Sequence, residues 1–409
     1  MRLEALPGAH LTYCTNIHPG ESWEDVRGAL RTHVVEVKKR VAPKVPFGVG
    51  LRLAARAARD LEGSPGALDE ARGELDDAGL YVFTLNGFPY GAFHATRVKE
   101  NVYRPDWLED ERVLYTQALA RVLARLLPEG TPGSISTVPG CFQERAGQGA
   151  PRAIAHNVAR AAAELVRIER ETGKIIALAL EPEPACLLET TDQALLFFEN
   201  ELFHREVLDA FARGIGADAS GAEATLRRHV GVCLDACHAS VEFERPVMAL
   251  QKLRSAGIPV PKIQLSAGLR IVPATPRALD ELRAFDDGVY FHQTVVRNGD
   301  ERDSATARLR RFVDLPDAFR AAPELGKGTE WRVHFHVPVF HAELGSFSST
   351  QEDLRELVVL ATELSPHLEV ETYTFDVLPK AFRDRPVTEA IARELEWVLA
   401  ALAERRPSA

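Results

Sequence analysis

Carboxylate, amide and imidazole side chains stand at or near the ends of several short apolar runs in this sequence. They are Glu181, Asp235, His238, Gln264, His334, His336 and Glu371. A charge at such a position is costly to bury unless a cation or a network of partners offsets the cost. Their mixture of oxygen and nitrogen atoms suits Mn²⁺, Zn²⁺, Mg²⁺ or Fe²⁺ better than it suits a thiolate-based centre. The sequence therefore predicts a divalent metal ion as cofactor.

The predicted ligands divide by role. We expect one divalent ion to be held by Glu181, Asp235, Gln264 and Glu371. We expect His238 and His336 to orient substrate oxygens or to bind a second ion. Each residue also has a plainer explanation, because a carboxylate after a strand is commonly a polar strand end and a histidine in an apolar strand is commonly structural. The metal prediction depends on several of these residues meeting at one edge of the fold.

The elements that must bring these residues together alternate between two types. Short apolar runs that suit buried parallel strands occur at 10–15, 47–53, 80–86, 133–138, 175–180, 230–235, 262–266 and 368–374. Helical periodicity occurs between them, for example at 109–127, 150–172, 190–212 and 351–364. This alternation predicts an α/β fold, a (β/α)8 TIM barrel whose site lies at the carboxyl ends of the strands. The alternative is an open doubly wound sheet, although no G-x-G-x-x-G motif follows a strand.

The last two predicted strands of the barrel are about a hundred residues apart, which is far more than one helix requires. Within this segment, 289–296 and 331–337 both have the pattern of strands, and the Arg-rich stretch 298–314 is expected to be a solvated connection. We therefore predict a single TIM-barrel domain over 1–409. Residues 267–345 are predicted to form an inserted hairpin or lobe over the barrel mouth, between strands 7 and 8.

Composition excludes several classes of protein. The chain has 409 residues, of which 45% are hydrophobic, and a formal charge of −10. Such a chain can bury a full core, which excludes general disorder, and its negative charge argues against nucleic acid as a partner. No apolar run approaches the roughly 18 residues of a transmembrane segment, and the N-terminus lacks a signal-peptide core. The five cysteines form no CxxC pair, which favours free thiols in a reducing cytoplasm.

A second set of polar residues follows the first and third predicted strands. It consists of Asn16, His18, Asn86, Tyr90 and His94. Loops that carry such side chains on a rigid barrel suit a pocket that recognises hydroxyls or an anionic group. We expect this set, together with His238 and His334, to bind a small polar metabolite. The alternative is that the glycines and prolines of the loop after the third strand only shape a turn.

The order of these residues resembles the xylose-isomerase-like TIM-barrel superfamily, which includes sugar phosphate isomerases and epimerases and endonuclease IV-like hydrolases. Glu181-Pro-Glu-Pro184 is similar to the Glu-Pro-Lys-Pro segment of xylose isomerases, and Asp235-Ala-Cys-His238 to the Asp-x-x-His of the epimerases and endonucleases. The resemblance implies that Glu181 and Glu371 are catalytic and exchange a substrate proton. Two departures are that Glu183 replaces the lysine of xylose isomerases, and that Gln264 stands where most members have histidine.

Longer segments resemble the Ebo-cluster metabolite traffic protein E family over nearly the whole chain. They are 11–21, 83–91, 103–107 and 133–139. This resemblance implies a role in secondary metabolism, with other proteins of the same metabolite traffic cluster as partners.

The leading hypothesis is a divalent-metal-dependent isomerase or epimerase of a sugar or cyclitol-like metabolite. One alternative is a phosphoester hydrolase with a di- or trinuclear site, to which His238, His334 and His336 would contribute. Another is a non-catalytic metabolite-binding or carrier barrel, because a fold does not determine function. The metal count separates the first two, since one ion per chain favours isomerase chemistry and two or three favour hydrolysis.

Overall fold

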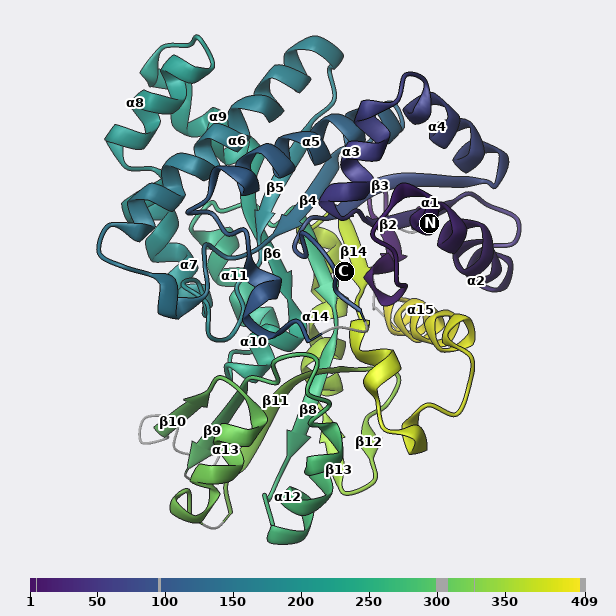
Figure 1. Cartoon of the computed structure of the whole chain (residues 1–409), viewed down its shortest axis with the longest axis vertical. Helices are drawn as coiled ribbons and strands as arrows, with labels where there is room; N and C mark the ends of the chain where they lie inside the picture. Colours follow the sequence, from purple (N-terminus) through teal and green to yellow (C-terminus); the bar gives the residue numbers. More distant parts are fainter. Residues whose placement is uncertain (5, 95–96, 299–307, 327, 405–409) are drawn as a thin grey trace.

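The fold is built around a closed sheet of parallel strands (Figure 1). The computed structural model describes residues 1–4, 6–94, 97–298, 308–326 and 328–404. Within them, the sheet consists of β1 (His10–Tyr13), β2 (Phe47–Arg52), β3 (Leu80–Asn86), β4 (Gly133–Thr137), β5 (Ile176–Leu180), β6 (Val230–Asp235), β7 (Lys262–Leu265) and β14 (His367–Val370). The strands pair in the order β1-β14-β7-β6-β5-β4-β3-β2, and a parallel bridge between Cys14 and Gly50 joins β1 to β2. The predicted (β/α)8 barrel is confirmed.

The barrel strands are covered on both faces. Every residue in them is buried except Tyr81, which is half-buried. Strands that are buried on both sides read as continuous apolar runs, and this pattern made them recognisable in the sequence. The predicted runs therefore differ from the observed strands by only a few residues at their ends.

Helices lie around the barrel between successive strands (Figure 1). They are α1 (Trp23–Ala29), α2 (Val35–Val41), α3 (Ala55–Gly63), α4 (Ala67–Asp77), α5 (Asp110–Leu126), α6 (Ala150–Thr172), α7 (Thr191–Phe197), α8 (Arg205–Gly214), α9 (Ala222–His229), α10 (Ala236–Val241), α11 (Pro246–Ser255), α14 (Gln351–Leu364) and α15 (Val387–Ala403). Among the described residues, none of the helices has the length and apolar character needed to cross a membrane.

The predicted helix at 190–212 is divided in two. It begins at Thr190, which forms a capping box with Gln193, and α7 then continues into a π-helical turn at Phe198–Leu202. The second part, α8, starts anew behind His204, whose ring accepts a hydrogen bond from the backbone N–H of Glu206. The apolar periodicity continues across the break, so it could not reveal the interruption.

A second sheet lies outside the barrel (Figure 1). It consists of β8 (Ala267–Ile271), β9 (Thr294–Asn298), β10 (Arg308–Phe312), β11 (Glu330–Val337), β12 (Glu343–Leu344) and β13 (Phe347–Ser349), in the order β10-β9-β11-β8-β13-β12. All its strand pairs are antiparallel. Helices α12 (Pro276–Leu282) and α13 (Leu315–Ala321) belong to the same segment. The chain leaves the barrel after β7, builds this sheet, and returns through α14 to β14.

The inserted sheet is larger than the sequence indicated. It has its own hydrophobic core, which includes Leu269, Phe285, Trp331 and Phe335. Part of the Arg-rich stretch predicted to be a solvated connection is strand β10, which pairs with β9. The remainder of that stretch, 299–307, lies outside the described residues. The division into one barrel domain and an insertion over 267–345 stays a prediction.

The barrel interior contains a buried ion pair below the strand ends. Lys262 Nζ lies 2.5 Å from Glu369 Oε2, and both side chains are fully buried. Lys262 also donates a hydrogen bond to Ser136 at 3.2 Å. Glycine at position 50 makes room for the carboxylate, because a Cβ there would lie 2.0 Å from Glu369 Oε1.

Candidate metal centre

Three carboxylates meet at the carboxyl ends of the barrel strands. Glu181 directly follows β5, Asp235 is the last residue of β6, and Glu371 directly follows β14. Each side chain is buried, and one oxygen from each lies within 4.8 Å of the other two. We call these residues the carboxylate triad. The parallel barrel brings them together because all its strands end at the same rim.

Two amides orient Glu371. Asn16, shortly after β1, and Asn86, the last residue of β3, both donate hydrogen bonds to Glu371 Oε1, at 2.7 and 3.1 Å. The sequence predicted these asparagines as substrate-binding residues. In the structure they line the same pocket as Glu371 and hold that carboxylate in place.

Asp235 is oriented by the start of a helix. Its Oδ1 accepts hydrogen bonds from the backbone N–H of His238 and from Ser266 Oγ, both at 2.8 Å. The first bond forms because Asp235 is the N-cap of α10. Its other oxygen, Oδ2, is buried and has no hydrogen-bond partner among the described residues.

The carboxylate triad concentrates more negative charge than its surroundings neutralise. Burial, together with the neighbouring carboxylates, raises the pKa of Glu181 and of Glu371 well above the ordinary range. Among the described residues, Glu181 Oε2 also lacks a hydrogen-bond partner. Buried polar atoms normally have partners, so an orphaned oxygen on two of three converging carboxylates needs an explanation. A divalent cation meets this need, because carboxylate oxygens are ligands that such ions prefer.

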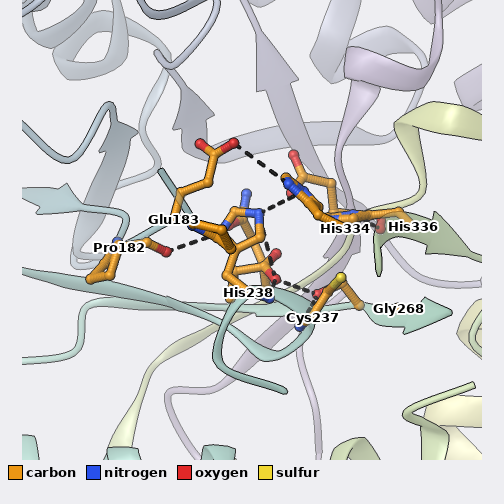
Figure 2. A network of polar contacts seen from close by, with 12 residues as sticks. Pro182, Glu183, Cys237, His238, Gly268, His334 and His336 are labelled. Atoms are coloured by element: carbon orange, nitrogen blue, oxygen red, sulfur yellow. Dashed lines mark hydrogen bonds and ion pairs between the residues drawn. The ribbon is translucent and has the colours of Figure 1, made fainter. Parts of the chain in front are cut away.

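Three imidazoles form a second group beside the first (Figure 2). His238 lies on α10, whereas His334 and His336 lie two residues apart on β11 and so share one face of that strand. His334 Nε2 lies 3.0 Å from His238 Nε2 and 3.2 Å from His336 Nε2. We call these residues the histidine triad. Asp235 adjoins both triads, because it groups with Glu181 and Glu371 and also with His238 and His336.

The proton positions in the histidine triad follow from the partners of the other ring nitrogens. His238 Nδ1 lies 3.0 Å from the carbonyl oxygen of Pro182, and His336 Nδ1 lies 2.9 Å from that of Glu371. A carbonyl oxygen can only accept, so each Nδ1 carries a proton, and in the neutral form of each ring the lone pair is at Nε2.

The same holds for His334. Its Nδ1 lies 2.8 Å from Gln293 Oε1, and the amide nitrogen of Gln293 donates to Tyr103 Oη at 2.8 Å and to the carbonyl of Pro184 at 3.1 Å. Because the amide nitrogen of Gln293 faces these acceptors, its amide oxygen faces His334. His334 Nδ1 therefore donates its proton to that oxygen, and in the neutral ring the lone pair is at Nε2.

Three lone pairs that converge in this way repel one another unless a cation lies among them. Burial lowers the pKa of His336 to about 4 and that of His334 well below its ordinary value, so neither of these two rings holds a second proton near neutral pH. The separations of His334 Nε2 from the Nε2 atoms of His238 and His336 fit neighbouring ligands of one metal ion, since metal–nitrogen bonds of roughly 2.0–2.1 Å place such ligands roughly 3.0–3.4 Å apart. The oxygen partners of the three Nδ1 atoms are the kind that orient metal-binding histidines.

Glu183 extends the network on the side of His334 (Figure 2). Its Oε1 accepts hydrogen bonds from Tyr103 Oη at 2.8 Å and from Gln293 Nε2 at 3.3 Å, and it lies 3.6 Å from His334 Nδ1. Burial raises the pKa of Glu183. From the sequence, Glu183 was noted only as a difference from xylose isomerases. Neither Tyr103 nor Gln293 was predicted as a site residue. A polar interruption at 292–294 within an apolar run is the signal that could have drawn attention to Gln293.

A pocket borders both groups. Its polar floor is Asn16, Asn86, Glu181, Glu183, His238, His334 and Glu371. Its apolar wall is Phe88, Pro89, Phe93, Val98, Val102, Tyr290 and Phe291. Lys99, Tyr103 and Tyr373 complete the lining, which surrounds about 510 Å³ of space that is partly open to solvent. The apolar wall comes from the loop after β3 and from the inserted segment before β9.

Three residues predicted to bind substrate are not part of this pocket lining. His18 lines a separate and smaller cavity, where its ring stacks on His33. His94 Nε2 lies 2.6 Å from the carbonyl oxygen of Asn16, and Tyr90 packs edge-on against Tyr115. Their contacts position the loops that follow β1 and β3, and a direct contact with substrate stays a prediction.

Gln264 lies on the barrel strand next to that of Asp235. It pairs in register with Asp235 and is fully buried on β7. Its Oε1 accepts a hydrogen bond from the thiol of Cys233 at 3.3 Å, while its Nε2 has no partner among the described residues. Its role as a metal ligand stays a prediction.

Cys237 adjoins the histidine triad. Its Sγ lies within 4.8 Å of ligand nitrogens of His334 and His336. Burial and nearby carboxylates raise its thiol pKa well above the ordinary value. The thiol is therefore neutral in the metal-free protein.

Fold and site together define an α/β barrel with a candidate divalent-metal centre at the carboxyl ends of its strands. No protein-family profile and no curated protein matches the sequence.

Solved structures match over most of their length. A zinc-bound IolI protein is 13% identical, with 98% of this chain and 100% of that chain covered and a TM-score of 0.44. A xylose isomerase domain protein from Planctomyces limnophilus is 15% identical, with 90% and 91% covered and a TM-score of 0.46. SacUVDE is 10% identical, with 96% and 99% covered and a TM-score of 0.36. At these values the likeness carries no conclusion about this chain's chemistry, which is argued from its own residues.

Proposed function

We propose that this protein is a divalent-metal-dependent isomerase or epimerase that acts on an α-hydroxycarbonyl unit of a sugar- or cyclitol-like metabolite. The carboxylate triad is the observation that carries the proposal. Glu181 and Glu371 lie on the floor of the pocket, and one oxygen of Asp235 lies within 4.8 Å of theirs. Glu181 and Asp235 each have one buried oxygen without a partner among the described residues. Glu181, Asp235 and Glu371 would hold the ion, and the asparagines bonded to Glu371 fix the direction of that ligand.

A bound divalent ion supplies Lewis-acid stabilisation of the negative charge that develops when a proton leaves the carbon beside a carbonyl. Glu181 and Glu371 would take and return that proton, because both line the pocket and a positioned carboxylate can act as a general base. Closely packed pocket walls would limit the access of water to the intermediate.

Elemental analysis and proton exchange test this proposal together. The full chain is purified as wild type, as Glu371→Gln and as Glu111→Gln, a control at an exposed position on α5. Each is assayed for bound metal and for solvent-deuterium incorporation into a panel of α-hydroxy ketones and aldoses. We expect Glu371→Gln to lose both metal and exchange, while Glu111→Gln keeps both. Full metal content and full exchange in Glu371→Gln would disprove the assignment.

The histidine triad favours a second candidate function, metal-dependent phosphoester hydrolysis. Asp235 adjoins both triads, and a shared carboxylate between two ions is a feature of sites that hydrolyse phosphoesters. Two or three ions per chain together with cleavage of bis(p-nitrophenyl) phosphate would favour this function. Deuterium exchange without phosphoester cleavage would favour the isomerase, whether or not the histidine triad also holds an ion.

We also propose a small metabolite as the ligand and other proteins of a metabolite traffic cluster as partners. This part rests on the sequence resemblance alone. Co-purification of the tagged chain with the products of neighbouring genes tests it, and recovery of the chain without them would count against it.

A further inference from the structure

The pocket has two chemically different halves. Its polar floor consists of side chains at the strand ends and on β11, whereas its apolar wall is made of aromatic and aliphatic side chains. Three members of the wall, Phe93, Val98 and Tyr290, pack together as a small hydrophobic cluster separate from the barrel core. Each of these three is no more than 6% exposed. The wall is therefore a preformed apolar surface that faces the ligand space.

The polar atoms on this side of the pocket are already engaged by the protein. The Tyr290 hydroxyl donates a hydrogen bond to the carbonyl oxygen of Phe93 at 3.0 Å. Lys99, which borders the wall, forms a buried ion pair with Asp314, and its Nζ lies 5.4 Å from the ring of Phe291. A hydroxyl group placed against this surface would lose its water partners and find few replacements, which is unfavourable.

Backbone contacts keep the wall in place. Val98 and Lys99 both donate their backbone N–H to the carbonyl oxygen of Val289, at 2.9 and 3.2 Å. These bonds join the loop after β3 to the inserted segment, so the two parts of the wall are held together across the pocket. The apolar surface is therefore part of the folded structure and does not depend on a ligand to form.

We infer that the substrate carries an apolar, preferably aromatic, group beside the unit that binds the metal ion. The inference rests on the proposed function, because the metal-binding unit is assigned to the polar floor. It narrows the substrate class from freely polyhydroxylated sugars to compounds with one polar, chelating end and one flat apolar body. Aromatic side chains such as Phe93 and Tyr290 favour edge or stacked contacts with such a body.

Three hydroxamic acids test the inference on the metal-loaded full chain by calorimetry. All three carry the same chelating group, but their tails differ: acetohydroxamic acid has a methyl group, phenylacetohydroxamic acid a benzyl group, and erythronohydroxamic acid a polyhydroxylated chain. We expect the benzyl compound to bind at least ~10-fold more tightly than the other two, because its ring removes apolar surface from water. Phe93→Ala and the milder Phe291→Ala should each remove most of this preference and leave acetohydroxamic acid unaffected. Phe319→Ala, at an aromatic residue that lines a different cavity in the inserted sheet, should leave all three affinities unchanged.

The outcomes separate this inference from the proposed function. Equal affinities for the three compounds, or a preference for the polyhydroxylated tail, would overturn the inference while the metal site stands. If none of the three binds more tightly with metal than without it, an open metal centre is absent and the proposed function fails together with the inference.

Discussion

The imidazoles of His238 and His334 face each other through Nε2 atoms 3.0 Å apart, and both rings donate their Nδ1 proton to an oxygen. Two lone pairs at this distance repel each other. His336 adds a third at 3.2 Å from His334. A metal ion among these nitrogen atoms would turn the repulsion between their lone pairs into attraction, and this leads to the first prediction.

Replacing His334 with alanine should remove one metal ion from the protein without emptying the carboxylate triad. The histidine triad loses its central member, whereas Glu181, Asp235 and Glu371 remain. Titration of the metal-free full chain with Zn²⁺ should show one fewer ion per chain than wild type. His156→Ala, at a half-buried position on α6, is the control and should match wild type. Equal stoichiometry for all three proteins would show that the histidine triad does not bind metal.

The asparagines that orient Glu371 should influence metal affinity without binding metal themselves. In Asn16→Leu the 2.7 Å hydrogen bond to Glu371 Oε1 is lost, and the carboxylate keeps only its longer bond to Asn86. Loss of such an orienting partner typically weakens metal binding by ~10- to 100-fold. Competition with a chromogenic chelator measures the change, and Asn200→Leu, at an exposed site, provides the baseline. Unchanged affinity in Asn16→Leu would mean that the hydrogen bond plays no part in ligand orientation.

The stability of the protein should fall much more when one partner of the buried ion pair is replaced than when both are replaced. In Lys262→Met, Glu369 stays buried without its partner at 2.5 Å. Breaking a buried pair in this way destabilises proteins by ~3–5 kcal/mol, whereas replacing both partners with apolar residues is often nearly neutral. Urea unfolding should therefore show a large loss for Lys262→Met and recovery of most of it in Lys262→Met/Glu369→Leu. A double variant as unstable as the single one would contradict this account.

Glu394 should make the stability of the protein depend on pH near neutrality. Burial raises its pKa from 4.5 to about 7, although Thr372 Oγ1 and the backbone N–H of Val339 donate hydrogen bonds to it. A carboxyl with a raised folded-state pKa contributes stability that is fully present below the unfolded pKa and is lost as the pH rises through the folded pKa.

The variant Glu394→Gln has no ionisable carboxyl group at this position. Its free energy of unfolding relative to wild type should therefore rise between pH 5 and pH 8, by ~2–3 kcal/mol from the size of the pKa shift. Urea unfolding of both proteins in the presence of EDTA measures the difference without interference from metal binding. A difference that is the same at both pH values would place the folded-state pKa of Glu394 near its ordinary value.

In the inserted sheet, some strands could be predicted from the sequence and others could not. The run at 331–337 was recognisable because apolar and polar residues alternate in it, and β11 occupies nearly the same positions. Strand β8 follows β7 after a single residue and carries no turn signal that separates the two, so it was not predicted. The stretch at 308–312 is rich in arginine and has little apolar surface, and it becomes a strand because β9 offers it a hydrogen-bonding edge.

The amino-acid sequence by itself determined the barrel and the positions of its carboxylates. Runs that are apolar on both faces must be buried strands, and a charge that follows such a run must lie at a strand end, so Glu181, Asp235 and Glu371 could be expected at one rim. Only the tertiary structure decided how the imidazoles are protonated and what surrounds the ligand space. The Nδ1 proton of His334 depends on Gln293, and the apolar wall joins Phe93 to Tyr290 across nearly two hundred residues of chain. Such contacts depend on where distant segments meet in space, so they cannot be predicted from the local periodicity of the sequence.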